Sequence, residues 1–171
     1  GLRRATDNHL VLEHGLGAGK STVSLAVLEV LGIQHALVLC PPSVKAVWRD
    51  ELAENAARSW VVWAGEVKGN NGKALKNPSV ARRVEAITAA HEDARRLGRP
   101  FMAVVNYEST HQAVMSKFLL GSPWDALICD ESQHLAGSAS SGSRFTAKLA
   151  KLIRARGGRI ILCTGTFMPH S

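Results

Sequence analysis

One stretch of sequence decides the fold, and it reads His9-Leu10-Val11-Leu12-Glu13-His14-Gly15-Leu16-Gly17-Ala18-Gly19-Lys20-Ser21. His9–Glu13 predicts a short strand, and the glycines of Gly15–Gly19 predict a tight turn. Helical spacing follows over Lys20–Leu31 and ends at Gly32. We expect its inward face to carry Val23, Ala26, Val27 and Val30. A strand joined to a helix by a glycine-rich turn predicts the first half of a βαβ unit.

The same alternation of strand and helix continues along the chain. Apolar runs predict strands at Ala36–Cys40, Trp60–Trp63, Phe101–Val105, Asp125–Cys129 and Arg159–Cys163. Helical patterns cover Val44–Ala56 (with Ser43 as its N-cap), Val80–Leu97, His111–Leu120 and Phe145–Arg156. Loops are predicted at Gly65–Pro78 and Gly137–Gly142. The sequence therefore predicts an α/β fold, a three-layer sandwich with a mostly parallel sheet.

Length and composition indicate one globular domain of 171 residues, of which 46% are hydrophobic. Lys and Arg number 21 against 14 Asp and Glu, and the net charge of +7 favours an anionic partner. The apolar runs are too short to span a membrane, and no secretion signal is visible. Because the chain begins at Gly1 and stops at Ser171 just past an apolar run, we expect a fragment truncated at both ends.

The cysteines and tryptophans are expected to be structural. Cys40, Cys129 and Cys163 each lie in or end a strand-like run, their number is odd, and no CxxC spacing occurs. They are therefore interpreted as small buried hydrophobic residues in a reducing compartment rather than as disulfide partners or zinc ligands. Core positions are likewise expected for Trp48, Trp60 and Trp63.

The glycine-rich turn is typical of a phosphate-binding loop, because it follows a strand and opens a helix. Backbone N–H groups of the loop and the helix N-terminus would bind phosphate oxygens. Lys20 would reach the β- and γ-phosphates of ATP, and the Ser21 hydroxyl would bind Mg²⁺. The strict motif has glycine at the position of His14. The predicted nucleotide-binding residues are Gly15, Gly17, Ala18, Gly19, Lys20, Ser21 and Thr22.

A second acidic element ends another strand. Trp124–Cys129 leads directly into Asp130 and Glu131. Adjacent carboxylates at a strand end are costly to bury unless a metal or a proton-transfer task holds them. We predict that Asp130 holds Mg²⁺ through its water shell and that Glu131 polarises the attacking water.

These motifs, taken in order, resemble the first RecA-like domain of superfamily-two helicases and translocases, in the Swi/Snf-like branch. Motif I of that branch also lacks the first glycine. Ala36–Leu52 resembles motif Ia, Val104–Glu108 motif Ib, Asp130–Gln133 motif II (the DExH/Q box) and Cys163–Thr166 motif III. The proline that usually follows motif III is Phe167 here. Some phage-encoded and bacterial relatives are especially similar.

The resemblance implies an ATP-binding lobe that couples ATP hydrolysis to movement on nucleic acid, with ATP and Mg²⁺ as ligands. It implies catalytic roles for Glu131, Lys20 and Gln133, and coupling roles for Ser132, Thr164, Gly165 and Thr166. Backbone contacts to duplex DNA are expected from Pro41, Ser43, Lys45, Asn106 and Tyr107. A second RecA-like lobe of the same full-length chain would supply the arginine fingers, so this fragment alone is expected to be weakly active. The expected compartment is the bacterial cytosol or an infected host cell.

Three alternatives remain open at this point. The chain could be the motor lobe of a type I or type III restriction subunit. It could instead be a small P-loop kinase or nucleotide-binding regulator, although nothing marks an arginine-bearing lid. A non-hydrolysing DNA-binding lobe is the third alternative, and the presence of Lys20, Asp130 and Glu131 argues against it.

Overall fold

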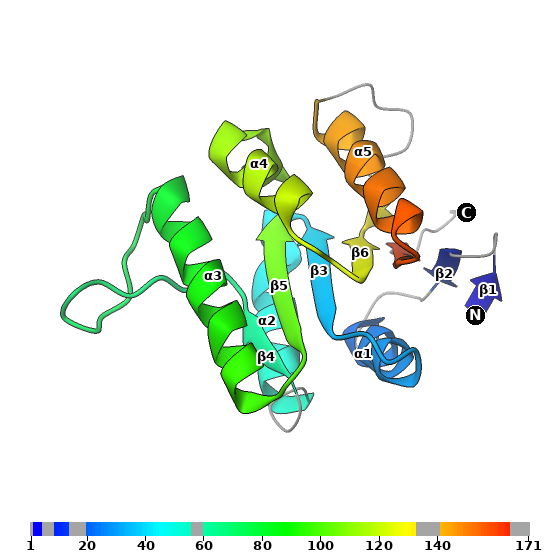
Figure 1. The fold of residues 1–171 in the computed structure, drawn as a ribbon, viewed down its shortest axis with the longest axis horizontal. Helices are drawn as coiled ribbons and strands as arrows, with labels where there is room; N and C mark the ends of the chain where they lie inside the picture. The colour runs from blue at the N-terminus through cyan, green and yellow to red at the C-terminus, as the bar shows by residue number, and fades with distance from the viewer. Residues whose placement is uncertain (1, 5–8, 14–19, 56–59, 133–140, 165–171) are drawn as a thin grey trace, which may run out of the picture.

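The computed structural model describes residues 2–4, 9–13, 20–55, 60–132 and 141–164. Its strands are β1 (Leu2–Arg4), β2 (His9–Glu13), β3 (His35–Cys40), β4 (Val61–Trp63), β5 (Phe101–Asn106), β6 (Ala126–Asp130) and β7 (Arg159–Thr164). Its α-helices are α1 (Lys20–Val30), α2 (Pro42–Asn55), α3 (Val80–Leu97), α4 (Ala113–Gly121) and α5 (Ser141–Ala155), and a 3-10 helix, η1, covers Tyr107–His111. Figure 1 shows how these elements are arranged.

The strands form one sheet in the order β1-β2-β7-β6-β3-β5-β4. Every neighbouring pair from β2 to β4 is parallel, and β1 is antiparallel to β2 at one edge. All five positions of β6 and all six of β3 are buried, as expected for parallel strands that are covered on both faces. The predicted α/β fold with a mostly parallel sheet is therefore confirmed.

Two apolar clusters cover the two faces of the sheet and make it the middle layer of three. Helices α1 and α2 pack on one face, where Leu25, Leu28 and Trp48 meet inward residues such as Val38 and Ile128. Helices α3, α4 and α5 pack on the other face (Figure 1). There Ile87, Leu119 and Leu149 meet strand residues such as Leu37 and Leu127. Successive strand residues alternate between the two clusters because their side chains point to opposite faces.

Some local expectations were wrong. For α1, the expected inward face is confirmed at Val23 and Val27, which pack against the core, but Ala26 is exposed and Val30 is 86% exposed. Among residues 23–30 the buried positions are Ser24, Leu25 and Leu28. The apolar residues of this helix lie on more than one of its sides, so their spacing could not specify which face points inward.

The predicted helix starts also need correction. Ser43 does not cap α2, because Pro42 is its first residue, a position at which proline's missing N–H costs nothing. The predicted helix over His111–Leu120 begins later, at Ala113, after η1. Helix α5 begins at Ser141, inside the predicted loop.

The strand-like cysteine runs and the three tryptophans behave as predicted. Cys40, Cys129 and Cys163 are buried with free thiols, and Trp48, Trp60 and Trp63 belong to the core. Within the described parts of the chain, no helix combines the length and apolarity that a membrane crossing requires.

Candidate functional site

The carboxyl ends of the parallel strands bring the predicted site residues to one edge of the sheet. In the register of the ladder, Leu12 of β2 pairs with Cys163 of β7, and Cys163 pairs with Asp130 of β6. On the other side of β6, Cys40 of β3 pairs with Asn106 of β5. The strands therefore end together, at the edge where ligands bind in open α/β sheets.

Asp130 ends β6 with its carboxylate turned toward the α1 and α2 layer. The residue is only 3% exposed, so its two oxygens depend on protein donors or a ligand. One oxygen accepts a hydrogen bond from the Glu131 backbone N–H at 2.9 Å. The other accepts one from the indole N–H of Trp48 on α2. These contacts orient Asp130, and a carboxylate oxygen can accept more than one hydrogen bond, including one from a metal-bound water.

Glu131 has a left-handed backbone conformation, with a φ of +52°. It is the one non-glycine residue with positive φ within the described parts of the chain. Such a conformation costs about 1–2 kcal/mol for a residue with a Cβ. It turns the chain sharply after β6 and leaves Glu131 half-buried beside Asp130. Strained positions of this kind cluster at functional sites, where the surrounding structure maintains them.

Tyr107 anchors this acidic turn from the neighbouring segment after β5. Its hydroxyl donates to the backbone carbonyl of Asp130 at 2.8 Å. Burial, together with nearby Cys129 and Asp130, raises the pKa of Tyr107 well above its ordinary value, so the hydroxyl stays a donor. The Tyr107 carbonyl in turn accepts from Thr110 Oγ1 at 2.6 Å. The structure thus gives Tyr107 a positioning contact, and its predicted contact with DNA stays a prediction.

Burial also dominates the chemistry of the nearby thiols. Cys40 and Cys129 lie on neighbouring strands, level with the acidic turn. Burial, reinforced by Asp130, raises the pKa of Cys40 to about 12, although Lys45 opposes the shift. Burial likewise raises the pKa of Cys129 to about 12. Both thiols are therefore protonated at neutral pH and are unsuited to nucleophilic or metal-binding roles.

The first turn of α1 reaches the same edge of the sheet. Lys20, Ser21 and Thr22 are its first three residues, and α1 follows β2, which lies beside β7. The Oγ of Ser24 lies 3.4 Å from the Sγ of Cys163, and Leu28 is fully buried against the same face of the sheet. Only β7 separates β2 from β6, so those two strands lie about 10 Å apart. A phosphate chain with its metal ion can bridge such a separation.

The residues predicted to contact nucleic acid lie farther along the same edge. Pro41 precedes α2, Ser43 is exposed in its first turn, and Lys45 is half-buried one turn before Trp48. Asn106 ends β5, and its buried Oδ1 has no hydrogen-bond partner among the described residues.

Several predicted site residues lie outside the described residues. They are Gly15, Gly17, Ala18, Gly19, Gln133, Gly165 and Thr166. Two further residues with predicted coupling roles are described. Thr164 ends β7 and pairs with Glu13, and half-buried Ser132 follows Glu131.

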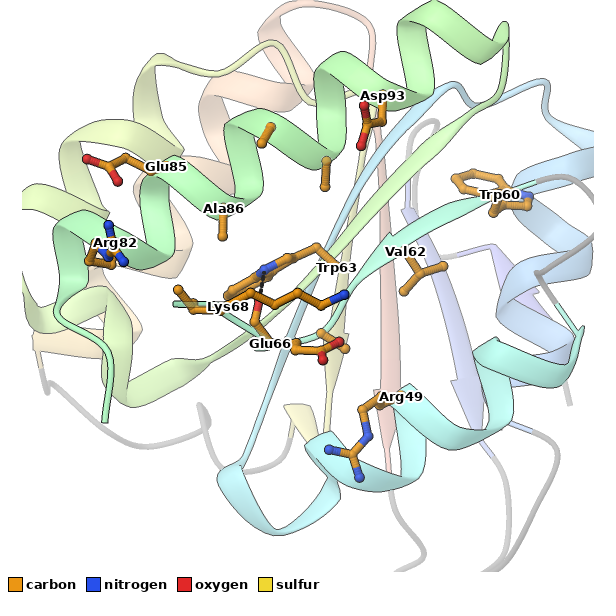
Figure 2. Close-up of a pocket in the computed structure, with 14 residues that line it drawn as sticks. Arg49, Trp60, Val62, Trp63, Glu66, Lys68, Arg82, Glu85, Ala86 and Asp93 are labelled. Atoms are coloured by element: carbon orange, nitrogen blue, oxygen red, sulfur yellow. Dashed lines mark hydrogen bonds between the residues drawn. The ribbon is translucent and has the colours of Figure 1, made fainter. Parts of the chain in front are cut away.

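A hollow of about 730 Å³ lies away from this edge site, between β4, α2 and α3 (Figure 2). Trp63, Val62 and Ala86 contribute apolar surface, and arginine and carboxylate side chains also line the hollow. None of the predicted site residues lines it.

Sequence reasoning missed the contact of Trp48 with Asp130. The tryptophan was expected only as a core residue, and no pattern in the sequence pairs α2 with the end of β6. A scan against protein-family models finds no match to the chain, and a search of the curated proteins finds no significant relative. The site is therefore interpreted from its own geometry and chemistry.

Proposed function

We propose that this chain is a nucleoside-triphosphate-binding domain of the RecA-like type that hydrolyses ATP as part of a nucleic-acid-dependent helicase or translocase. One observation carries the proposal. The start of α1, with Lys20 and Ser21, and the acidic pair Asp130 and Glu131 meet at the carboxyl edge of one parallel sheet, with a single strand between their own strands. A phosphate-binding helix start beside a buried carboxylate is suited to binding a metal–triphosphate.

The residues present fit a Mg²⁺ ion bound mainly through phosphate and water. Among the residues that the structure describes, no cluster of three or more His, Cys, Asp or Glu could hold a metal by protein ligands alone. Mg²⁺ commonly binds through one or two protein ligands, substrate phosphates and several waters. Asp130, held by Trp48 and the Glu131 N–H, is the acceptor for such a water, and Ser21 is the second ligand. The ion would neutralise charge on the phosphates during transfer.

Glu131 is the proposed base, because it adjoins Asp130 and belongs to a turn that holds it in place. Its backbone N–H donates to Asp130, and Tyr107 holds the Asp130 carbonyl. The two carboxylates are thereby given different tasks. Asp130 is buried and would accept from a metal-bound water, whereas half-buried Glu131 would exchange a proton with the attacking water.

Nucleic acid is the proposed partner, and duplex DNA is the form we favour. The support is the net charge of +7 and the polar groups of Ser43, Lys45 and Asn106 on the same edge. These groups suit contacts to backbone phosphates, which carry no sequence information. A second RecA-like lobe is proposed to close over the ATP and to supply arginine fingers, which are worth roughly 10³–10⁵ in rate in related phosphoryl transfer.

The first test is the binding of a fluorescent ATP analogue with Mg²⁺. We expect the unmodified chain to bind it and Lys20→Ala to lose binding, because the variant removes the charge that contacts the β- and γ-phosphates. Lys151→Ala, which removes an exposed charge from α5, is the matched control and should bind normally. Equal binding by Lys20→Ala and the control would refute the phosphate-loop assignment.

The second test concerns hydrolysis. In a chain that also carries the proposed second lobe, Glu131→Gln should keep nucleotide binding and lose DNA-stimulated phosphate release. Release that does not respond to DNA, with transfer of the phosphoryl group to a small acceptor, would instead indicate a kinase.

A further inference from the structure

The positive charge of the protein is concentrated on two neighbouring helices, α4 and α5. Together they carry five Lys and Arg residues and no Asp or Glu, whereas the whole chain has a net charge of +7. Each of the other three α-helices contains at least one acidic residue beside its basic ones. Surfaces of globular proteins usually intersperse charges of both signs, so this segregation indicates an anionic partner.

The basic residues of α5 lie on its solvent side. Leu149 is fully buried against the sheet, whereas Arg144, Lys148 and Lys151 are exposed. These three follow one another at intervals of four and three residues, so they form one line along the helix. At 1.5 Å per residue the line is about 10 Å long. None of the three forms an ion pair with a described residue.

Lys117 of α4 adds a fourth exposed charge to the same surface. It is also without an ion pair among the described residues, and buried Met115 and Leu119 lie on the opposite side of its helix. Helices α4 and α5 contact each other on one face of the sheet (Figure 1). We call the surface formed by Lys117, Arg144, Lys148 and Lys151 the basic face.

The composition of the basic face favours a nucleic-acid backbone over a protein as its partner. Interfaces between proteins have an apolar centre and are depleted in lysine. Leu152 and Val114 are the large apolar side chains that the described parts of α5 and α4 expose, and they are too few for such a centre. Lysine and arginine are the side chains that contact backbone phosphates, and these contacts need no apolar anchor.

We propose that the basic face binds the phosphate backbone of a nucleic acid, at a site separate from Ser43, Lys45 and Asn106. The choice of nucleic acid rests on the function proposed above, whereas the anion-binding face itself is inferred from its charges. Contacts of this kind carry no sequence information, so the face would hold the protein on any duplex. Helix α5 packs on the opposite face of the sheet from α1, so this binding needs no nucleotide.

The first test measures the affinity of the chain for a short labelled DNA duplex at several salt concentrations, without nucleotide. A lost phosphate contact makes the slope of log affinity against log salt shallower by about 0.9. The test variant replaces the three charges of the α5 line: Arg144→Gln, Lys148→Gln and Lys151→Gln. We expect its slope to be shallower by about 2–3. Glutamine is a good helix former, so the helix should be kept.

Two control variants separate the position of the charges from their number. One replaces three exposed arginines at the end of α3 and just beyond it: Arg95→Gln, Arg96→Gln and Arg99→Gln. Its slope should change by less than half as much. The other keeps every charge of the α5 line and should keep the slope: Arg144→Lys, Lys148→Arg and Lys151→Arg. An unchanged slope in the test variant, or an equal change in either control, would overturn the proposal.

Footprinting of the unmodified chain tests the basic face even if a variant fails to fold. Acetylation of lysines is followed by mass spectrometry with and without the duplex. We expect the duplex to protect Lys148 and Lys151 more strongly than Lys73 and Lys76, which are exposed between β4 and α3. Equal protection of the two sets would overturn the proposal. Protection of Lys148 and Lys151 by polyglutamate of the same charge concentration that matches their protection by DNA would overturn the choice of nucleic acid.

These experiments separate the two proposals. Failure of the chain to bind ATP, with Lys148 and Lys151 still protected by DNA, would remove the proposed function and leave the basic face. Normal ATP binding, with DNA bound at a slope that the α5 variant does not change, would remove the basic face alone.

Discussion

The indole N–H of Trp48 donates a hydrogen bond to the buried carboxylate of Asp130. This contact joins the helix that follows β3 to the end of β6, two segments 82 residues apart in sequence. Trp48 is 2% exposed and Asp130 is 3% exposed, so water does not compete for the bond. Tyr107 adds a second tie, from its hydroxyl to the Asp130 carbonyl. The acidic turn is therefore held by side chains from two other elements.

Replacing Trp48 by Phe should destabilise the protein by more than the smaller ring alone would cause, because the indole N–H that donates to Asp130 is also lost. Trp48→Phe leaves a buried charged acceptor with one donor fewer, which costs about 1–3 kcal/mol. Trp60→Phe is the matched control: Trp60 is 3% exposed, and its Nε1 has no partner among the described residues. The measurement is urea unfolding followed by circular dichroism. Equal losses in the free energy of unfolding for the two variants would show that the bond to Asp130 contributes nothing.

The backbone strain at Glu131 predicts a difference between two substitutions. Glu131→Gly and Glu131→Ala both delete the carboxylate, so they differ only in the Cβ at a φ of +52°. Because glycine accepts this conformation without a steric cost, Glu131→Gly should be more stable by about 1 kcal/mol. Thermal unfolding of the two variants under one buffer condition measures the difference. A more stable alanine variant would show that the backbone of the turn relaxes without strain.

The sheet was predictable because its strands are buried on both faces and therefore appear as short continuous apolar runs. Phe101–Val105 and Arg159–Cys163 are examples, and each lies within an observed strand. Strand β1 was missed, because Leu2–Arg4 is short, contains two arginines and pairs only at an edge. The inward face of α1 was predicted only in part, because the helix carries apolar residues on more than one side: Val23 and Val27 pack against the core, whereas Val30 is exposed.

The candidate site was only partly predictable. The acidic pair and the glycine-rich turn are local patterns, so the sequence displays them. The tie between Trp48 and Asp130 depends on β3 lying beside β6, and the approach of Lys45 to the Trp63 ring depends on α2 meeting edge strand β4. Strand order and helix placement are tertiary properties, and no local spacing encodes them.

The three buried thiols should be unreactive in the folded protein. Cys40, Cys129 and Cys163 are each at most 1% exposed, and the pKa of Cys40 and of Cys129 is raised to about 12. A thiol reagent at pH 8 should therefore label the native chain slowly and label all three cysteines in urea. The absorbance of the chromophore that the reagent releases gives both the rate of labelling and the number of cysteines labelled. Native labelling as fast as that of free cysteine would contradict the described packing.

His35 should make stability depend on pH below neutrality. Its ring stacks on His91 at 4.1 Å, and its Nδ1–H donates to the Pro123 carbonyl at 3.0 Å. Burial, reinforced by His91, lowers the pKa of His35 from 6.5 to about 4. Between these values the unfolded chain binds a proton that the folded chain does not, so the free energy of unfolding falls as the pH falls from 6.5 to 4. Above pH 6.5 this contribution is fully present.

The matched variant is His35→Phe, which keeps an aromatic ring in the stack and cannot titrate. It loses the bond to Pro123 at every pH, so its melting temperature at pH 7.5 is expected to be lower than that of the unmodified chain. As the pH falls from 6.5 to 4, however, its melting temperature should fall less steeply, because the carboxylates titrate in both chains and the buried histidine only in one. Melting curves at half-unit intervals across that range measure the two slopes. Parallel slopes would mean that His35 is protonated in the folded protein as readily as in the unfolded chain.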